Sequence, residues 1–274
     1  MKTTALLMRM ALLAGAASCH SAYQTIPYAQ SAALKTKLPF IKEYAKGPKT
    51  VFVYGSYHTN DSTDAEGKDI ERNLAAFRPD IILYEGDYIG VEASRNASLS
   101  TYFEMGLARW WAAKHAVKEL NLEPPAQGKY RFLQKKFATD QIMLAAILGQ
   151  NTLFIKQHTR SEFEQLFPSL IKDFEREGLR LTDEQKALPH FYAAYAAFYN
   201  KPFDPATFDY ETVEIKFTKT VLNKINQTSA RYRDQFMLAR IDSCLRVHNR
   251  VYVQVGGRHA LVWQPALQRL VAAR

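Results

Sequence analysis

The chain of 274 residues contains almost no cysteine. Cys19 and Cys244 are the only two, so disulfide bonds cannot form a framework for the fold. Cys244 lies in an apolar helical pattern, which is typical of a small buried side chain rather than a nucleophile. The fold must therefore depend on a hydrophobic core. A content of 47% hydrophobic residues is sufficient for one large domain or two small ones.

Dense runs of like charge are also missing, although the formal net charge is +9. The basic residues are scattered along the chain. An early group comprises Lys35, Lys37, Lys42, Lys46 and Lys49, and a central group comprises Arg131, Lys135 and Lys136. No nucleic-acid-binding motif accompanies them. The charge therefore predicts a solvated basic surface, and we expect no nucleic-acid partner.

Long hydrophobic runs are absent too, and the one short run lies near the N-terminus. Lys2 and Arg9 precede the apolar residues 10–17, a pattern typical of an export signal and too short for a membrane anchor. Residues 16–19, AASC, resemble a bacterial lipoprotein box, which would make Cys19 the lipidated first residue. Cleavage by an ordinary signal peptidase is the alternative. We expect export to the bacterial periplasm or cell envelope, with membrane contact only through a lipid on Cys19.

The rest of the chain divides into a short leading segment and one domain. Residues 1–19 are expected to be the signal peptide, of lipoprotein type. Residues 20–48 are polar and lysine-rich with three prolines, which predicts a linker and a surface segment with a short helix. Residues 49–274 are expected to form a single domain, with a helical insertion over about residues 100–247.

Strand patterns occur at both ends of this domain. Residues 50–54, 81–84 and 251–255 are apolar, β-branched and aromatic, and residues 66–77 between the first two form an amphipathic helix pattern. Continuous apolar strands favour a sheet covered on both faces. The remaining predicted helices are 107–120, 139–148, 161–177, 182–199, 213–245 and 261–271. The sequence thus predicts an α/β (α+β) fold: a mixed central sheet built from both chain ends, with a large helical insertion.

Two of these strands end in the same motif, Gly-x-x-His. Gly55 precedes His58, and Gly256 precedes His259. The glycines would allow a sharp backbone turn. The carboxyl edge of such a sheet is where ligands bind. If the two strands are neighbours, their imidazoles can converge there.

Glu85 ends the remaining strand, and it is expected at the same edge. Two histidines and one carboxylate are a common ligand set for first-row metals, so His58, Glu85 and His259 are candidate metal ligands. Each residue alone also has an ordinary interpretation. Either histidine is compatible with a structural hydrogen bond, and Glu85 with a helix cap or a lysine partner.

Four stretches of this chain together resemble the TraB/TIKI family, within the wider erythromycin-esterase/ChaN-like superfamily. They are GSYH at 55–58, PDIILYEGD at 79–87, RYRDQFMLARI at 231–241 and VYVQVGGRH at 251–259. The match covers roughly residues 50–87 and 228–271. Between them, ARWWAAKHAVKELNLEPP at 108–125 is only loosely similar to the family's helix and following acidic-Pro segment.

The resemblance implies a site with five residues. His58, Glu85 and His259 would be central, and Arg233 would be a supporting cation oriented by Asp234. Family members include metal-dependent hydrolases, macrolide esterases with a histidine base, and haem-binding lipoproteins. The resemblance thus indicates the site more clearly than the reaction.

The leading hypothesis is a hydrolase of a peptide or ester bond in a small-molecule or peptide substrate. Either a divalent ion (Mn, Co, Zn or Fe) acidifies a bound water, or Glu85 or a histidine activates water as a general base. Arg233 would stabilise the oxyanion. A haem- or ligand-binding lipoprotein without catalysis is the alternative, with Tyr57 and Tyr84 flanking the site, and a scaffold without activity is the third.

Three other side chains leave alternatives open. Arg240 lies on nearly the same helix face as Arg233 and is compatible with either the site or a surface ion pair. Arg258, inside the second Gly-x-x-His, would either hold an anionic substrate group or point to solvent. Trp110 and Trp111 are expected to serve packing alone.

Overall fold

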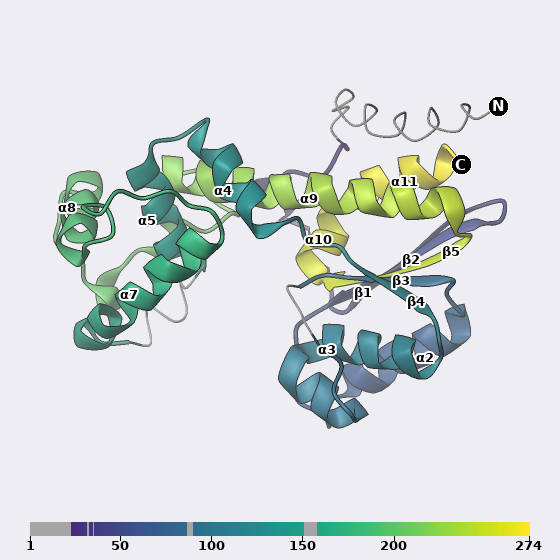
Figure 1. Cartoon of the computed structure of the whole chain (residues 1–274). Helices are drawn as coiled ribbons and strands as arrows, with labels where there is room; N and C mark the ends of the chain where they lie inside the picture. The colour runs from purple at the N-terminus through teal and green to yellow at the C-terminus, as the bar shows by residue number, and fades with distance from the viewer. Residues whose placement is uncertain (1–22, 32, 35, 87–89, 151–157) are drawn as a thin grey trace, which may run out of the picture.

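The computed structural model describes most of the chain (Figure 1). The described residues are 23–31, 33–34, 36–86, 90–150 and 158–274. The expected export signal and Cys19 therefore lie outside them. Across these ranges no helix is both long and apolar enough to cross a membrane.

The centre of the fold is a five-stranded mixed sheet. Its strands are β1 (Phe40–Lys46), β2 (Lys49–Ser56), β3 (Ile81–Tyr84), β4 (Lys118–Asn121) and β5 (Arg250–Gly256). Their order is β1-β2-β5-β3-β4, in which only the β1–β2 pairing is antiparallel. The last strand of the chain thus lies between β2 and β3. The prediction of a mixed sheet formed from both chain ends is confirmed.

The register brings the two Gly-x-x-His motifs side by side. Gly55 is paired with Val255, and Ser56 with Gly256. On the other side of β5, Tyr84 is paired with Gln254, and the backbone N–H of Glu85 donates to the Gln254 carbonyl at 3.0 Å. Because these strands run parallel, both motifs and Glu85 reach the same edge of the sheet.

Both faces of the sheet are covered, as the continuous apolar strands predicted. Val51 and Val253 point to one face, where they pack with α9 (Val221–Val247) and α11 (Gln264–Ala272). Tyr54, Ile82 and Tyr252 point to the other, where a second core lies against α2 (Ala65–Phe77) and α3 (Arg95–Lys114). Figure 1 shows these helices as layers on the two sides of the sheet. Trp110 and Trp111 belong to the second core, which confirms their packing role.

The helical insertion has its own core. It comprises α4 (Ala126–Gln134), α5 (Thr139–Gln150), α7 (Arg160–Arg176), α8 (Leu188–Tyr199) and the first turns of α9. Two short 3₁₀ turns, η1 (Pro205–Thr207) and η2 (Tyr210–Thr212), precede α9. Helix α9 runs from this core across the sheet, so a single rigid element connects the two parts (Figure 1).

Several predicted boundaries are wrong. Residues 118–120, predicted as the end of a helix, belong to strand β4, because pairing with β3 outweighs their helical periodicity. Helix α9 begins at Val221 rather than at residue 213: the Thr220 side chain and the Asn223 side chain cap it reciprocally. Helix α8 begins at Leu188 rather than at residue 182.

The segment expected as a linker is part of the fold. Residues 40–46 form edge strand β1, and α1 (Tyr28–Ser31) contacts α10 (Gly257–Val262). The backbone N–H of Tyr23 donates to the Gln235 side chain at 2.7 Å. Lysine-rich composition suggested a loop, but an edge strand tolerates exposed lysines on its outer face.

Candidate functional site

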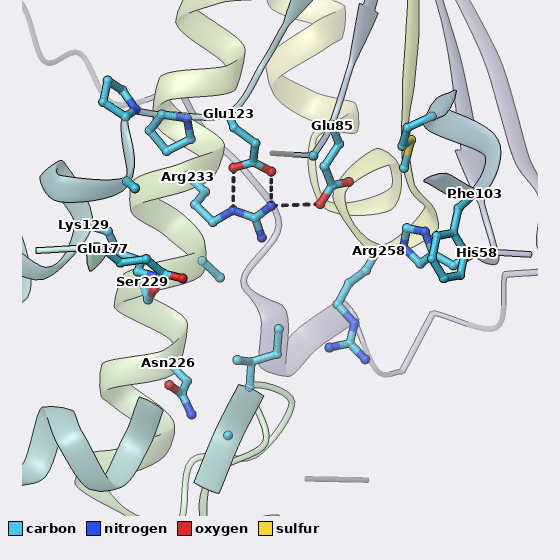
Figure 2. Close-up of a pocket in the computed structure, with 18 of the residues that line it drawn as sticks. His58, Glu85, Phe103, Glu123, Lys129, Glu177, Asn226, Ser229, Arg233 and Arg258 are labelled. Atoms are coloured by element: carbon cyan, nitrogen blue, oxygen red, sulfur yellow. Dashed lines mark hydrogen bonds and ion pairs between the residues drawn. The ribbon is translucent and has the colours of Figure 1, made fainter. Parts of the chain in front are cut away.

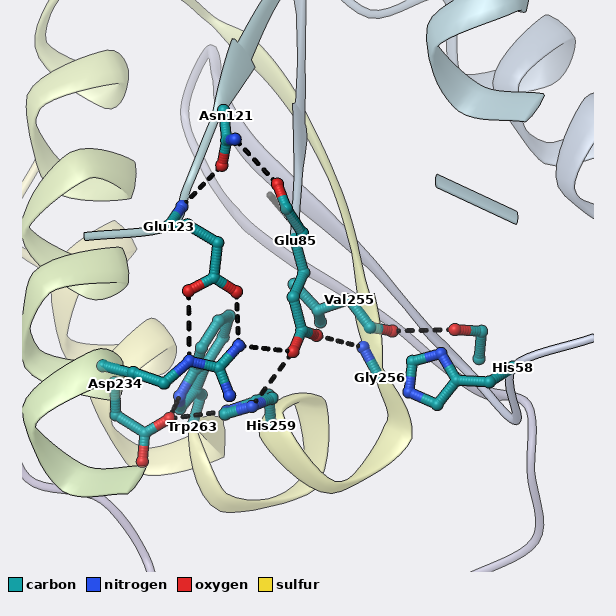
Figure 3. Close-up of polar contacts among 12 residues, drawn as sticks. His58, Glu85, Asn121, Glu123, Asp234, Val255, Gly256, His259 and Trp263 are labelled. Carbon is teal, nitrogen blue, oxygen red and sulfur yellow. Dashed lines mark hydrogen bonds and ion pairs between the residues drawn. The ribbon is translucent and has the colours of Figure 1, made fainter. Parts of the chain in front are cut away.

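Glu85 is the centre of a hydrogen-bonded network at the sheet edge (Figure 3). Its Oε2 accepts from the backbone N–H of Gly256 at 2.7 Å. Its Oε1 accepts from Arg233 Nη2 at 2.9 Å and lies 3.3 Å from His259 Nε2. Burial alone would raise the pKa of Glu85, but the positive charges of His259 and Arg233 and the Gly256 amide hold it well below its usual range. Glu85 is therefore an ionised carboxylate.

His259 has a carboxylate on each ring nitrogen. Besides Glu85 at Nε2, Asp234 Oδ1 lies 2.7 Å from Nδ1. Burial alone would lower the pKa of His259, but the two carboxylates raise it to about 10. The ring is thus an imidazolium that donates two hydrogen bonds.

Asp234 is held in turn by two aromatic side chains. The indole of Trp263 donates to Oδ1 at 2.7 Å, and the Tyr28 hydroxyl donates to Oδ2 at 2.9 Å. Asp234 itself is fully buried. Asp234 was expected to orient Arg233, but its carboxylate contacts His259 instead.

Arg233 is locked between two acids. Its Nε donates to Glu123 Oε2 at 3.1 Å, and its Nη2 donates to both Glu123 Oε1 and Glu85. A guanidinium held by both oxygens of one carboxylate has a defined orientation. Glu123 begins the acidic-Pro segment named in the family resemblance. That segment is therefore the sequence feature that could have indicated Glu123 as a site residue.

His58 is held by a different acid. Its Nδ1 lies 2.7 Å from Glu104 Oε1, and the Glu104 side chain is fully buried while that of His58 is 52% exposed. The Ser56 hydroxyl also donates to Glu104. The hydrogen bond to Glu104 raises the pKa of His58, against the opposing effect of burial. His58 also adopts a left-handed backbone conformation with φ of 64°, which is rare outside glycine and frequent at functional sites.

An interruption in α3 places Glu104. Tyr102 and Phe103 leave helical geometry, with φ and ψ of 56° and −162° at Phe103. Gly106 makes this possible, because a Cβ there would lie 2.4 Å from the Ser98 carbonyl and 2.7 Å from Tyr102 Cβ. No sequence pattern indicated this interruption, which is why Glu104 was missed.

The two motif glycines are needed for close contact rather than for a turn. Neither has a positive φ, so the expected reason for glycine is wrong. A Cβ on Gly256 would lie 2.6 Å from His58 Nε2, and one on Gly55 would lie 2.6 Å from Ala260 Cβ and 2.9 Å from Gly257 Cα. Each glycine makes room for the neighbouring motif.

A cleft of about 900 Å³ opens in front of these residues, between the sheet edge and the helical insertion (Figure 2). His58, Glu85 and Arg258 line it beside the sheet edge, and Asn226 and Arg233 line it from α9. Its volume suits a ligand of drug or short-peptide size. Of the five expected site residues, three line the cleft, and His259 and Asp234 support them from behind.

The three candidate metal ligands do not meet as a ligand set. Within the described ranges no three His, Cys, Asp or Glu side chains are grouped to hold a metal ion. Both ring nitrogens of His259 face carboxylates, and the oxygens of Glu85 hold Arg233 and the Gly256 amide. A divalent ion would have to replace these partners, so the donor set does not fit a metal in this arrangement.

The side chains left open by the sequence have distinct places. Arg240 donates to the Asn121 carbonyl and does not line the cleft. Arg258 lines it and lies 3.2 Å from Glu214. Tyr57 donates its hydroxyl to Asp64, and Tyr84 is buried beneath Arg109, so neither expected aromatic neighbour lines the cleft.

Comparisons with protein-family models, with curated proteins and with solved structures find no match for this chain. The TraB/TIKI resemblance therefore stays a prediction based on the motifs alone.

Proposed function

We propose that this chain hydrolyses an ester or peptide bond in the cleft, with His58 as the general base. The pairing of His58 with the buried Glu104 carries this proposal. A carboxylate on Nδ1 favours the tautomer with the proton there and leaves the Nε2 lone pair for a reacting water. His259 is unsuited to this role, because both of its nitrogens donate to carboxylates.

The reaction then follows from the placement of these groups. His58 Nε2 takes a proton from water as the water oxygen bonds to the substrate carbonyl carbon. The tetrahedral intermediate collapses when the bond from that carbon to the leaving nitrogen or oxygen breaks. The imidazolium of His58 returns its proton to the leaving group, so the base is regenerated.

In this proposal, Arg233 stabilises the oxyanion. Its Nε and Nη2 are used by Glu123 and Glu85, which leaves Nη1 as the guanidinium nitrogen without a hydrogen bond to another described residue. The two carboxylates prevent the side chain from reorienting. A fixed donor of this kind lowers the barrier because it does not reorganise as charge develops.

The family resemblance supports the same residues but also implies a metal ion in some members. The described donors do not fit one, so the proposal is the metal-free form of hydrolysis. Haem binding without catalysis is the other function that the resemblance implies, and there the half-exposed His58 would be the axial ligand.

A matched pair of histidine variants tests the proposal. Chromogenic esters and fluorogenic peptides are screened against wild type, His58→Gln and His190→Gln. His190 also contacts a carboxylate, Asp140 at 3.0 Å, but lies outside the cleft. We expect a loss of about 100-fold or more in kcat for His58→Gln only, since general-base catalysis contributes about 10²–10⁴-fold. Equal activity of the two variants would contradict the proposal.

We also propose that the chain is exported and anchored through Cys19. Three residues separate Cys19 from Tyr23, whose backbone forms two hydrogen bonds with the Gln235 side chain on α9. A lipid on Cys19 would therefore hold the folded domain close to the membrane surface. We expect metabolic labelling with palmitate in wild type and none in Cys19→Ala. Labelling of that variant would contradict the anchor.

A further inference from the structure

We propose that Arg258 binds a carboxylate of the substrate, adjacent to an aliphatic side chain that occupies a second, smaller cavity. This inference rests on the proposed function, since it names the substrate class of that same cleft. The substrate would be an N-acylated amino acid or the C-terminal residue of a short peptide.

Arg258 is the cleft cation best placed to contact a ligand. It belongs to the first turn of α10, directly before His259, so its backbone is held by the end of β5. Its side chain is 52% exposed. Figure 2 shows it among the residues that line the cleft.

The other cations of the cleft wall are less exposed than Arg258 and more closely paired. Arg233 is held by Glu123 and Glu85. Lys129 lies 2.7 Å from Glu177, and its side chain is only 14% exposed. The Arg258–Glu214 contact is longer, 3.2 Å, and more exposed. Ion pairs with an exposed member contribute little to stability, so a ligand can displace Glu214 from Arg258.

Glu214 also indicates which anion the site accepts. It is a carboxylate that already lies against Arg258, so a substrate carboxylate would replace it with a group of the same charge and shape. A guanidinium matches a planar carboxylate in a bidentate contact. Phosphate is disfavoured, because a dianion would face the carboxylates of Glu85, Glu123 and Glu177, which also line the cleft.

A second cavity of about 180 Å³ lies on the other side of Arg258. Arg258 and Ile215 line both this cavity and the cleft. Its remaining walls include Leu34, Leu38 and Leu261, and the first two are exposed leucines with more than 40% of their surface accessible. An aliphatic side chain beside the bound carboxylate would cover them, which favours leucine-like residues.

Binding measured by calorimetry on the exported chain tests this inference without any turnover. The probe is N-acetyl-L-leucine. The comparison ligands are N-acetyl-L-leucinamide, which lacks the charge, N-acetylglycine, which lacks the side chain, and inorganic phosphate. We expect N-acetyl-L-leucine to bind at least about tenfold more tightly than each of them. The amide loses the charge-assisted hydrogen bond to Arg258, N-acetylglycine loses the apolar burial, and phosphate faces the cleft carboxylates.

Two arginine variants localise the binding. Arg258→Gln should weaken N-acetyl-L-leucine binding about tenfold or more, whereas Arg246→Gln should leave it unchanged. Arg246 is the matched control, because it forms an exposed ion pair with Asp242 and does not line the cleft. Glu214→Gln, which removes the competing carboxylate, should strengthen binding.

Several outcomes would overturn the inference. Equal binding of the acid and its amide, or no effect of Arg258→Gln, would remove the carboxylate contact. Tighter binding of phosphate would replace the proposed anion, and equal binding of N-acetylglycine would remove the aliphatic cavity. A chain that hydrolyses no ester or peptide but binds N-acetyl-L-leucine through Arg258 would contradict the proposed function alone.

Discussion

The imidazole Nε2 of His58 lies 2.6 Å from the position that a Cβ on Gly256 would occupy. The two residues belong to different Gly-x-x-His motifs, on the adjacent strands β2 and β5. The converse contact joins Gly55 to the helix that carries His259. The repeated motif is therefore a pair of mutual close contacts, in which each glycine gives space to its neighbour.

Alanine at Gly256 should mainly reduce catalytic efficiency, whereas alanine at Gly55 should mainly reduce stability. Gly256→Ala would displace the imidazole of His58 and should reduce kcat/KM about 100-fold, because a shift of about 1 Å can have that effect. Gly55→Ala would press against the Gly257 backbone and should lower the free energy of unfolding by about 1–3 kcal/mol. Hydrolysis rates and urea unfolding of both variants measure this. Full activity in Gly256→Ala would contradict the contact.

The pH dependence of the rate should report the His58–Glu104 pair. A general base works in its neutral form, and Glu104 raises the pKa of His58 above its usual value of 6.5. Activity should therefore fall as the pH decreases through a pKa above 6.5. Glu104→Gln should move this acid limb to lower pH and reduce the maximal rate.

The matched control for that profile is Asp140→Asn, which removes the carboxylate from His190 outside the cleft. It should leave the acid limb of kcat/KM in place. An acid limb that does not move in Glu104→Gln would show that another group titrates.

Stability should fall at alkaline pH because of His259. Its pKa is about 10 in the folded chain and 6.5 in the unfolded reference. A raised pKa means that the folded state holds the proton more tightly. The stabilisation is thus complete below about pH 6.5 and is lost as the pH rises toward about 10. Urea unfolding at pH 6, 8 and 9.5 should show this decline, with a flatter dependence in His259→Gln.

Two tyrosine-to-phenylalanine variants should differ in stability, because one removes a hydrogen-bonded hydroxyl and the other removes a hydroxyl without a hydrogen-bond partner in the described residues. The Tyr28 hydroxyl donates to buried Asp234, so Tyr28→Phe should lower the free energy of unfolding by about 1–3 kcal/mol. The Tyr44 hydroxyl is buried without a hydrogen-bond partner in the described residues, so Tyr44→Phe should be neutral or stabilising. Equal thermal shifts in the two variants would contradict the role assigned to Tyr28.

Elemental analysis with an absorption spectrum should find neither a stoichiometric metal nor a Soret band in residues 20–274. The reason for the first is that both nitrogens of His259 already contact carboxylates. The reason for the second is that charged side chains, Glu123, Lys129 and Arg233 among them, line the cleft. Near-stoichiometric Mn, Co, Zn or Fe that His58→Ala/His259→Ala loses would overturn the metal-free mechanism. A Soret band lost in His58→Ala would favour haem binding.

Much of the sheet could be predicted from local sequence. The apolar runs at 50–54, 81–84 and 251–255 contain enough β-branched and aromatic residues to indicate strands. Weaker segments could not be assigned in this way. Residues 118–121 pair with β3, and 40–46 pair with β2, so both are strands only because a neighbour supplies their hydrogen bonds.

The candidate site could also be predicted only in part. His58, Glu85 and His259 follow strands, so their arrival at one sheet edge follows from parallel pairing. Arg233 and Asp234 came from the family resemblance. Glu104 could not be predicted, because it reaches His58 only through the interruption of α3 that Gly106 permits.

The sequence by itself determined which side chains reach the edge of the sheet, because strand length and side-chain alternation are local properties. Only the tertiary structure decided what each histidine does there. His259 became a buried imidazolium because Glu85 and Asp234 arrive from another strand and from α9. His58 Nε2 has no hydrogen-bond partner among the described residues, because Glu104 contacts its other nitrogen and Gly256 leaves space beside it. Those neighbours are distant in sequence, and protonation depends on the neighbours that folding brings together.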